Sequence, residues 1–274
     1  MDMTDTLDTM KAAQKVKGDY IMDGLLYCGK CHTQKEVIIN VMGQIRKQKC
    51  VCRCEQDKII EERKRIEQKE RMEKVKRMKN VGFPDADMEK MTFDMDDHSN
   101  EHISKVARRY VEKFDQMKAK GKGLLLYGSV GTGKTFISAC IANELIEKGH
   151  PCLVTNFARL TNTLMGMYEG KQTYLDSLNQ FDLIVIDDLA SERDTEFMSE
   201  IIQTIIDSRY RSGKPMIVTT NLTPQELKHP ADVRKERIYS RLFEMCVPVE
   251  VKGKDRRKEK LKQDYKSMEE VLGL

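Results

Sequence analysis

One eight-residue stretch, GSVGTGKT from Gly128 to Thr135, restricts the possible folds of this 274-residue chain more than any other feature. It matches the P-loop pattern, in which glycines let the backbone wrap closely around a phosphate group. The loop amides point at the β-phosphate, Lys134 adds charge toward the β- and γ-phosphates, and Thr135 offers its hydroxyl to magnesium. The pattern therefore predicts that ATP and Mg²⁺ bind at Gly128, Ser129, Val130, Gly131, Thr132, Gly133, Lys134 and Thr135.

The sequence around this loop has the alternation of an α/β protein. An apolar run, 124–127, ends directly before the loop, and a helix-forming run starts at Lys134. Further strands are expected at 152–155, 182–187 and 215–220, and helices at 103–118, 134–148, 157–168 and 195–211. Such alternation is typical of a parallel sheet covered by helices. This context favours a phosphate loop over an ordinary glycine-rich turn.

Two carboxylates, Asp187 and Asp188, follow the apolar run 183–186. Four apolar residues in a row suit a strand that is buried on both faces. Its carboxyl end is expected beside the P-loop, so Asp187 is predicted to hold magnesium, directly or through water. Asp188 is predicted to orient and activate the attacking water. The alternative is a strand end that meets solvent, where acidic residues are common.

Asn221 ends another strand-like run, 217–220, and is predicted to contact the γ-phosphate or the attacking water. The competing role is capping of the next helix. However, the segment from Thr223 to Glu226 already forms a Thr-x-x-Glu capping box, with Pro224 at the first helical position. Asn221 is therefore not needed as a cap.

Two arginines lie on a predicted helix over 236–243. At about 100° per residue, Arg237 and Arg241 share one face, and Ile238 and Leu242 lie on the opposite face. The apolar face should pack on the core and leave the arginines outward. Two interpretations remain open from the spacing: a solvated basic face, or an arginine finger that reaches the γ-phosphate of a neighbouring subunit.

Five of the eight cysteines crowd into residues 28–54. Four thiolates satisfy a tetrahedral zinc ion, so this cluster predicts a structural Zn²⁺ site with four of five ligands: Cys28, Cys31, Cys50, Cys52 and Cys54. His32 is a further candidate ligand. A redox C-x-x-C pair and a chance group of free thiols are the alternatives, but no βαβ pattern surrounds the pair. The scattered Cys140, Cys152 and Cys246 are expected to be small buried residues.

Charge dominates the segment between the cysteines and the P-loop. Residues 55–79 contain no proline or glycine and predict a solvated helix that ends at the Gly82-Phe83-Pro84 break, before an acidic, turn-rich linker over 84–100. The whole chain has 48 basic and 44 acidic groups, a balance too even to predict nucleic-acid binding by itself. No secretory signal and no apolar run of about 20 residues is visible, so a soluble, cytoplasmic chain without membrane contact is expected.

The order of these motifs resembles a known family. The cysteine cluster, the charged helix, GSVGTGKT, LIVIDDLASERDTEF, IIDSRYRSGKPMIVTTNL and ERIYSRLFEMC are together similar to the DnaC/DnaI-type replicative helicase loaders, especially those of phages and Gram-positive mobile elements. The resemblance covers residues 25–260. It implies an AAA+ core without a full lid domain, which agrees with the short tail after Phe243. It also implies Arg241 as the arginine finger and Arg257 as a sensor-2-like arginine, with Arg256 as the alternative.

The resemblance further implies three regions: a helicase-interaction module with the zinc site (1–54), the charged helix and acidic linker (55–100), and an AAA+ ATPase domain (101–274). The implied function is ATP-dependent loading of a hexameric replicative helicase onto single-stranded DNA at replication initiation, with ATP-dependent self-assembly. Three alternatives stay open: an IstB-like transposition helper ATPase, which normally lacks the cysteine module; a small-molecule P-loop kinase, which needs a substrate lid; and a zinc-dependent DNA-binding module with a regulatory P-loop.

Overall fold

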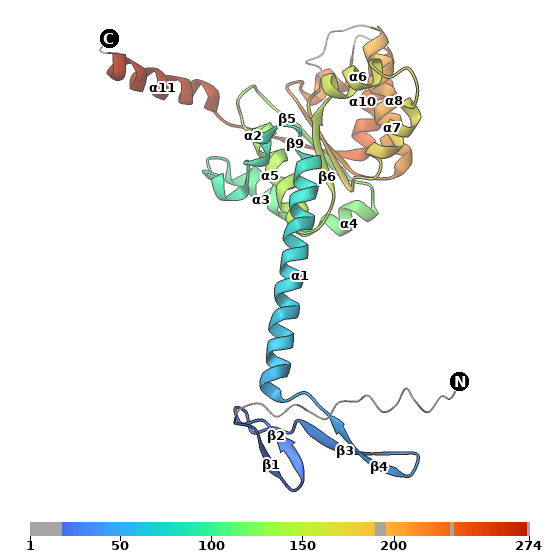
Figure 1. Cartoon of the computed structure of the whole chain (residues 1–274). Helices are drawn as coiled ribbons and strands as arrows, with labels where there is room; N and C mark the ends of the chain where they lie inside the picture. Colours follow the sequence, from blue (N-terminus) through green and yellow to red (C-terminus); the bar gives the residue numbers. More distant parts are fainter. Residues whose placement is uncertain (1–17, 190–195, 231–232, 273–274) are drawn as a thin grey trace. The chain divides into compact units, whose positions relative to one another are not determined.

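The computed structural model describes residues 18–189, 196–230 and 233–272 (Figure 1). The chain forms two compact units, 1–73 and 74–274, and helix α1 (Arg53–Gly82) contains the boundary between them. Residues 1–17 of the expected N-terminal module and 190–195 of the LIVIDDLASERDTEF motif lie outside the described residues. Among the helices that the structure describes, none is both long and apolar enough to cross a membrane.

Two short antiparallel hairpins, β1 with β2 and β3 with β4, build the N-terminal unit (Tyr20–Met22, Leu25–Tyr27, Glu36–Val41 and Gln44–Lys49). Its core contains few apolar side chains: within the described part of the unit, those that are buried are Leu25, Leu26, Cys28 and Cys52. A buried ion pair of 2.8 Å joins Lys35 and Asp19. A unit with so small a core needs a further source of stability, such as a metal ion.

Helix α1 is the charged helix that the sequence predicts, and it ends at Gly82 as expected. Side chains along most of its length are exposed, including Ile59 and Met72. Near its carboxyl end, Val75 and Met78 pack against the core of the C-terminal unit. The next segment is more ordered than the predicted linker: it contains α2 (Ala86–Glu89) and the 3-10 helix η1 (Phe93–Met95).

The predicted linker segment packs on the core because Phe93 is buried there. Asn143, a buried residue of helix α5 (Lys134–Glu147), donates hydrogen bonds to the carbonyl oxygens of Met88 (3.3 Å) and Met91 (2.8 Å). Residues 84–97 are therefore part of the C-terminal fold. This contact also brings Met91 close to the P-loop.

The C-terminal unit is built on a parallel sheet with the strand order β6-β7-β8-β5-β9. In this order the strands are β6 (Cys152–Asn156), β7 (Leu183–Leu189), β8 (Met216–Thr220), β5 (Gly123–Tyr127) and β9 (Cys246–Glu250). The first four are the predicted strands, and the predicted α/β class is confirmed. The edge strand β9 is not predicted, because it contains Pro248, which cannot donate a ladder hydrogen bond and is tolerated at an edge.

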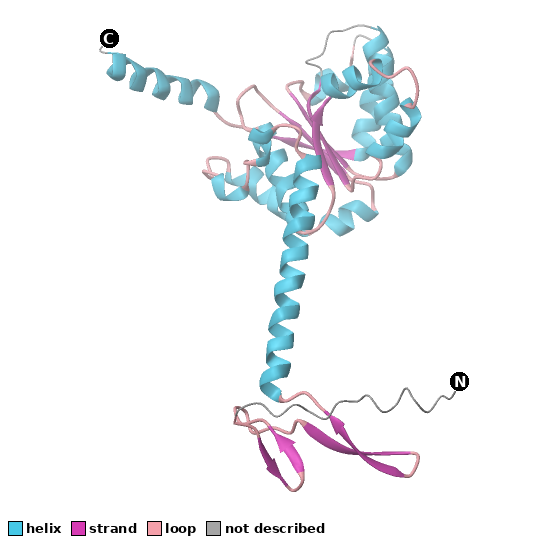
Figure 2. Cartoon of the chain, viewed as in Figure 1, coloured by secondary structure: helices cyan, strands magenta, loops and turns pink. Residues whose placement is uncertain are grey.

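Helices cover both faces of this sheet (Figure 2). Successive side chains of a strand alternate between the faces, so Leu124 and Leu126 pack into one core and Leu125 packs into the other. The first core lies under α3 (Glu101–Glu112) and α5. The second core lies under four helices: α6 (Phe157–Met165), α7 (Lys171–Leu178), α8 (Glu196–Ser212) and α10 (Val233–Met245).

Several helix boundaries differ from the predictions. The helix expected at 103–118 is two helices, α3 and α4 (Phe114–Ala119), because the chain turns at Lys113 and places Phe114 in the core. The helix expected at 157–168 ends at Met165. The capping box at Thr223 is present and starts α9 (Pro224–Lys228). In the described chain, β9 and α11 (Arg256–Leu272) follow α10.

The scattered cysteines Cys140, Cys152 and Cys246 are buried, as predicted. One arginine side chain, that of Arg209, is buried as well. Arg209 of α8 is 1% exposed, and its guanidinium donates to the carbonyl oxygens of Phe181, Asp182 and Pro215 at 2.7–3.2 Å. Burial lowers the pKa of Arg209 to about 10. The side chain joins α8 to the amino ends of β7 and β8.

We predict that Arg209→Leu lowers the free energy of unfolding by roughly 3 kcal/mol, because three carbonyl groups that are buried or partly buried lose their donor. Urea denaturation of the full chain measures the change. Arg211→Leu, on the exposed side of the same helix, is the control and should change stability by less than about 0.5 kcal/mol. Equal effects of the two substitutions would refute this role for Arg209.

Candidate nucleotide site and metal centre

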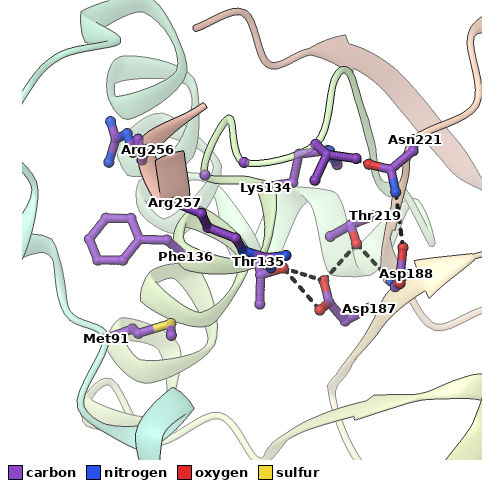
Figure 3. A pocket seen from close by; sticks show the side chains of 13 residues that line it. Met91, Lys134, Thr135, Phe136, Asp187, Asp188, Thr219, Asn221, Arg256 and Arg257 are labelled. Atoms are coloured by element: carbon purple, nitrogen blue, oxygen red, sulfur yellow. Dashed lines mark hydrogen bonds between the residues drawn. The ribbon is translucent and has the colours of Figure 1, made fainter. Parts of the chain in front are cut away.

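The strand order determines which side chains meet at the carboxyl edge of the sheet. β8 lies between β5, which leads into the P-loop, and β7, which carries the two aspartates. The carboxyl ends of parallel strands form the ligand-binding edge in such sheets. A cavity of about 450 Å³ opens there (Figure 3). Its predicted lining residues are Val130, Gly131, Gly133, Lys134, Thr135, Asp187, Asp188, Asn221 and Arg257.

The P-loop has the backbone that its glycines predict. Gly131 and Gly133 adopt φ values of 78° and 94°, which side chains disfavour. A Cβ atom on Gly131 would also lie 2.0 Å from the Asp255 carboxylate. Helix α5 starts at Lys134, and no side chain caps its amino end. The N–H groups of its first turn therefore remain available to an anion.

The Lys134 ammonium is held by three acceptors. Its Nζ donates to the carbonyl oxygens of Gly128 and Ser129 and to Asn221 Oδ1, each at 2.8 Å. Only a protonated amine has three N–H donors. Burial lowers the pKa of Lys134, and the two carboxylates at the end of β7 oppose that effect. The loop thus holds a positive charge at the point where the pattern predicts phosphates.

Asp187 accepts hydrogen bonds from two hydroxyl groups. Thr135 Oγ1 lies 2.9 Å from both carboxylate oxygens, and Thr219 Oγ1 lies 2.6 Å from Oδ1. Two neighbouring oxygen ligands of an octahedral Mg²⁺ ion, with bonds of about 2.0–2.1 Å, lie about 2.9 Å apart. The spacing and the oxygen chemistry of Thr135 and Asp187 fit this ion.

Asp188 lies in a bulge of β7. The pairing with β8 shifts between Ile186 and Leu189, and Asp188 adopts a left-handed φ of 61°. Bulges change the direction of a side chain, and aspartate tolerates this backbone region better than most residues. The Asp188 amide donates to Thr219 Oγ1 at 2.8 Å, and Asn221 Nδ2 donates to Asp188 Oδ1 at 3.3 Å. Asn221 therefore connects the lysine to the second aspartate.

The two neighbouring arginines of α11 have different partners. Arg256 pairs with Asp97 at 3.0 Å and also donates to the Ser99 hydroxyl. Arg257 forms no ion pair within the described residues, and its side chain points toward Thr135 (Figure 3). Both arginines line the cavity. Arg256 is therefore engaged by residues of its own chain, and the assignment of Arg257 as the sensor-2-like arginine stays a prediction.

Some predicted residues do not line this cavity. Gly128, Ser129 and Thr132 belong to the P-loop but do not line the cavity. The buried Thr132 hydroxyl donates to the Ser129 carbonyl at 2.9 Å, a hydrogen bond within the loop. Arg241 lies elsewhere, in a cavity of about 590 Å³ between α8 and α10. The predicted faces of α10 are correct, because Ile238 and Leu242 are buried and Arg241 is partly exposed.

Three residues that line the cavity were not predicted: Met91, Phe136 and Thr219. Thr219 lies on β8, two residues before Asn221. Side chains two positions apart along an extended chain point to the same side, and this spacing could have identified Thr219 from the sequence. Phe136 lies on the first turn of α5. Met91 has no signal in the sequence, because only the packing of residues 84–97 on α5 brings it to the site.

The second candidate site lies in the N-terminal unit. The Sγ atoms of Cys28, Cys31, Cys52 and Cys54 lie within 4.8 Å of one another, and Cys54 is 3.5 Å from both Cys28 and Cys52. Sulfur atoms around a tetrahedral zinc, with Zn–S bonds of about 2.3 Å, lie about 3.8 Å apart. The four thiols therefore fit a four-coordinate metal.

Cys50 and His32 stand outside this group. The Cys50 thiol donates to the Gln34 carbonyl at 3.4 Å, and His32 Nδ1 lies 3.3 Å from the Tyr20 hydroxyl. Among the described residues, the structure thus resolves which four of the five clustered cysteines gather.

The surroundings of the thiols suit metal binding. The Thr33 hydroxyl lowers the pKa of the Cys31 thiol to about 5, and the Cys31 amide lowers the pKa of Cys28. Hydrogen bonds to Cys52 and Cys28 raise the pKa of Cys54 to about 12. Thiolates are the form that binds metals, and a cation would relieve the crowding of negative charge at Cys54.

The sheet, the P-loop and the carboxylates of β7 define a P-loop protein with the AAA+ fold. Residues 39–264 match the family described as IstB-like ATP binding protein, and the chain belongs to this family. The crystal structure of DnaI shares the fold, with a TM-score of 0.52 and 24% identity over 62% of this chain and 96% of that one. The replication initiator DnaA bound to AMPPCP and single-stranded DNA does so with a TM-score of 0.50 and 23% identity over 64% of this chain and 55% of that one.

Curated relatives carry the name of replicative helicase loader. DnaI of Bacillus subtilis (strain 168) is 30% identical over 170 residues, which are 57% of this chain and 53% of that protein. DnaC of Escherichia coli (strain K12) is 31% identical over 125 residues, 44% of this chain and 50% of that protein. The chain thus spans about half the length of the curated relatives it matches.

We predict that Thr219→Val weakens magnesium-dependent ATP binding about tenfold, because Asp187 and the Asp188 amide both lose a hydrogen-bond partner. Isothermal titration with and without Mg²⁺ measures the effect. Thr220→Val is the matched control, since that buried hydroxyl bonds the Leu189 carbonyl and the Leu222 amide instead. It should leave the affinity within about twofold; an equal loss in both variants would contradict the role of Thr219.

A separate prediction concerns the thiols. Cys50→Ser should retain about one zinc per chain, whereas Cys52→Ser should lose it, because only Cys52 belongs to the four-thiol group. Elemental analysis of the purified full chain measures the metal. Loss of zinc should also expose the N-terminal unit to proteolysis. Wild-type protein without metal, or Cys52→Ser with full zinc, would disprove the assignment.

Proposed function

We propose that this protein is an ATP-dependent loader of a hexameric replicative helicase onto single-stranded DNA. The observation that carries the proposal is the similarity of the ATP-binding core to DnaI and DnaC, both named replicative helicase loaders. The four-thiol group supports it further, since the sequence resemblance to this class includes a cysteine module. ATP binding is expected from the family itself.

Hydrolysis of ATP is assigned to the polar groups of the cavity. Lys134 and the loop amides bind the phosphates, and Thr135 and Asp187 hold Mg²⁺, which neutralises charge on the phosphates when bound. Asp188 orients and activates the attacking water, and Asn221 holds that carboxylate in line with Lys134. Arg257 supplies a further positive charge at the phosphates.

The four thiols of Cys28, Cys31, Cys52 and Cys54 hold zinc, which stabilises the small N-terminal unit. We assign helicase contact to this unit. It exposes large apolar side chains on the β3–β4 hairpin, among them Ile38, Met42 and Ile45. Exposed apolar groups of this kind are typical of protein–protein contact surfaces.

Self-assembly on single-stranded DNA completes the proposal. Arg241 lines a cavity between α8 and α10 and does not line the nucleotide cavity of its own chain. We therefore assign it as an arginine finger that acts on the nucleotide of a neighbouring copy. The match to the IstB-like ATP binding family keeps a second candidate, an IstB-like transposition helper ATPase. That candidate leaves the cysteine module without a role.

The proposal is tested by a pull-down of purified hexameric replicative helicases on the immobilised full-length chain, with and without ATP. We expect retention of a helicase with the wild type and with Lys134→Ala, because the helicase contact lies outside the nucleotide cavity. Release of the helicase and its transfer to single-stranded DNA should respond to ATP in the wild type only. Cys52→Ser should lose retention. Absence of retention with every helicase would refute the loader function.

A further inference from the structure

The surroundings of Arg241 restrain its side chain. Arg241 Nε lies 2.8 Å from Asp207 Oδ1 of α8, and the guanidinium lies over the Tyr210 ring, 5.0 Å from its centroid. The Tyr210 hydroxyl donates to Glu244 Oε2 at 2.7 Å. Each helix thus contributes two residues three positions apart: Asp207 and Tyr210 on α8 face Arg241 and Glu244 on α10. Residues at this spacing lie on one helix face.

The contacts with Asp207 and Tyr210 leave the Arg241 guanidinium able to bind an anion. Arg241 forms its ion pair with Asp207 through Nε, and the buried Asp207 Oδ1 accepts no hydrogen bond from the described residues. Within the part of the chain that the structure describes, Arg241 donates no hydrogen bond. Its planar fork of N–H groups therefore remains available to phosphate oxygens. Its side chain is 35% exposed at the cavity of about 590 Å³.

A long arginine side chain has many rotamers, and fixing it during a reaction costs conformational entropy. The charge of Asp207, whose side chain is 17% exposed, restrains the guanidinium laterally. The Tyr210 ring restrains the guanidinium further through a cation–π contact. A cation held in this way has less freedom to lose when a phosphate arrives.

We propose that Asp207 and Tyr210 are positioning residues that hold the Arg241 guanidinium ready for the γ-phosphate of ATP bound to a second copy of this chain. The inference rests on the proposed function, in which Arg241 acts in trans. It adds two residues of α8 that touch neither nucleotide. They act only through the orientation of Arg241.

The test compares Asp207→Ala, Tyr210→Leu and Arg241→Ala in the full-length chain, by ATPase rate against protein concentration. Asp207→Ala and Tyr210→Leu should lower the rate of the assembled protein by about 10- to 100-fold, the effect of a misplaced catalytic group. Their ATP affinity at low protein concentration should equal that of the wild type, because their own nucleotide cavity is intact. Asp207→Asn, which keeps the shape without the charge, should lose less activity than Asp207→Ala.

Mixing distinguishes a positioning role from a merely structural one. Asp207→Ala mixed with Asp188→Asn should recover activity, because the first chain supplies an intact nucleotide site and the second supplies an intact Arg241. Asp207→Ala should add no further loss to Arg241→Ala, since the two residues act as one unit. Glu236→Gln removes a carboxylate from the same cavity. Since Glu236 forms no ion pair with Arg241 within the described residues, this variant is the control and should behave as the wild type.

The outcomes separate this inference from the proposed function. A slow Arg241→Ala together with wild-type rates for Asp207→Ala and Tyr210→Leu would overturn the positioning role and leave the trans finger intact. Wild-type rates for Arg241→Ala at every concentration would overturn both. Failure of Asp207→Ala to recover on mixing, while Arg241→Ala does recover, would assign Asp207 to the stability of its own chain and overturn the inference.

Discussion

The hydrogen bonding of β8 to β5 on one side and to β7 on the other is the constraint on which the nucleotide site depends. It places Thr219 and Asn221 between the P-loop and the two aspartates, which are distant in the sequence. Thr219 Oγ1 bonds both the Asp187 carboxylate and the Asp188 amide. Asn221 bonds both Lys134 and Asp188. One strand thus connects the groups that bind phosphate to those that bind metal and water.

Two features of the chain bring further groups to this edge of the sheet. The bulge in β7 inserts one residue and gives Asp188 a left-handed backbone, so the neighbouring aspartates have different partners. The segment after β9 passes over the P-loop, where the Arg256 amide donates to the Gly131 carbonyl at 3.0 Å. This contact fixes the start of α11 and with it Arg257. The P-loop and the start of α11 are therefore joined directly through their backbones.

The N-terminal unit has a different physical basis. Its hairpins bury few apolar side chains, and its four gathered thiols are free of disulfides. Mutual repulsion of thiolates would destabilise such a group, whereas a divalent cation converts it into a cross-link between the first hairpin and the start of α1. The stability of this unit is thus expected to depend on metal, while the C-terminal unit has two large apolar cores.

The sequence by itself determined the α/β class, four of the five strands of the parallel sheet, the P-loop with its lysine and threonine, and the buried faces of α10, because each depends on local periodicity or on a short motif. The thiol group was predicted as five candidates. Only the tertiary structure separated Cys50 from the other four, gave Arg256 and Arg257 different surroundings, and brought Met91 and Thr219 to the cavity. These outcomes depend on how distant segments pack and on which strands pair, and no local pattern in the chain encodes those distances.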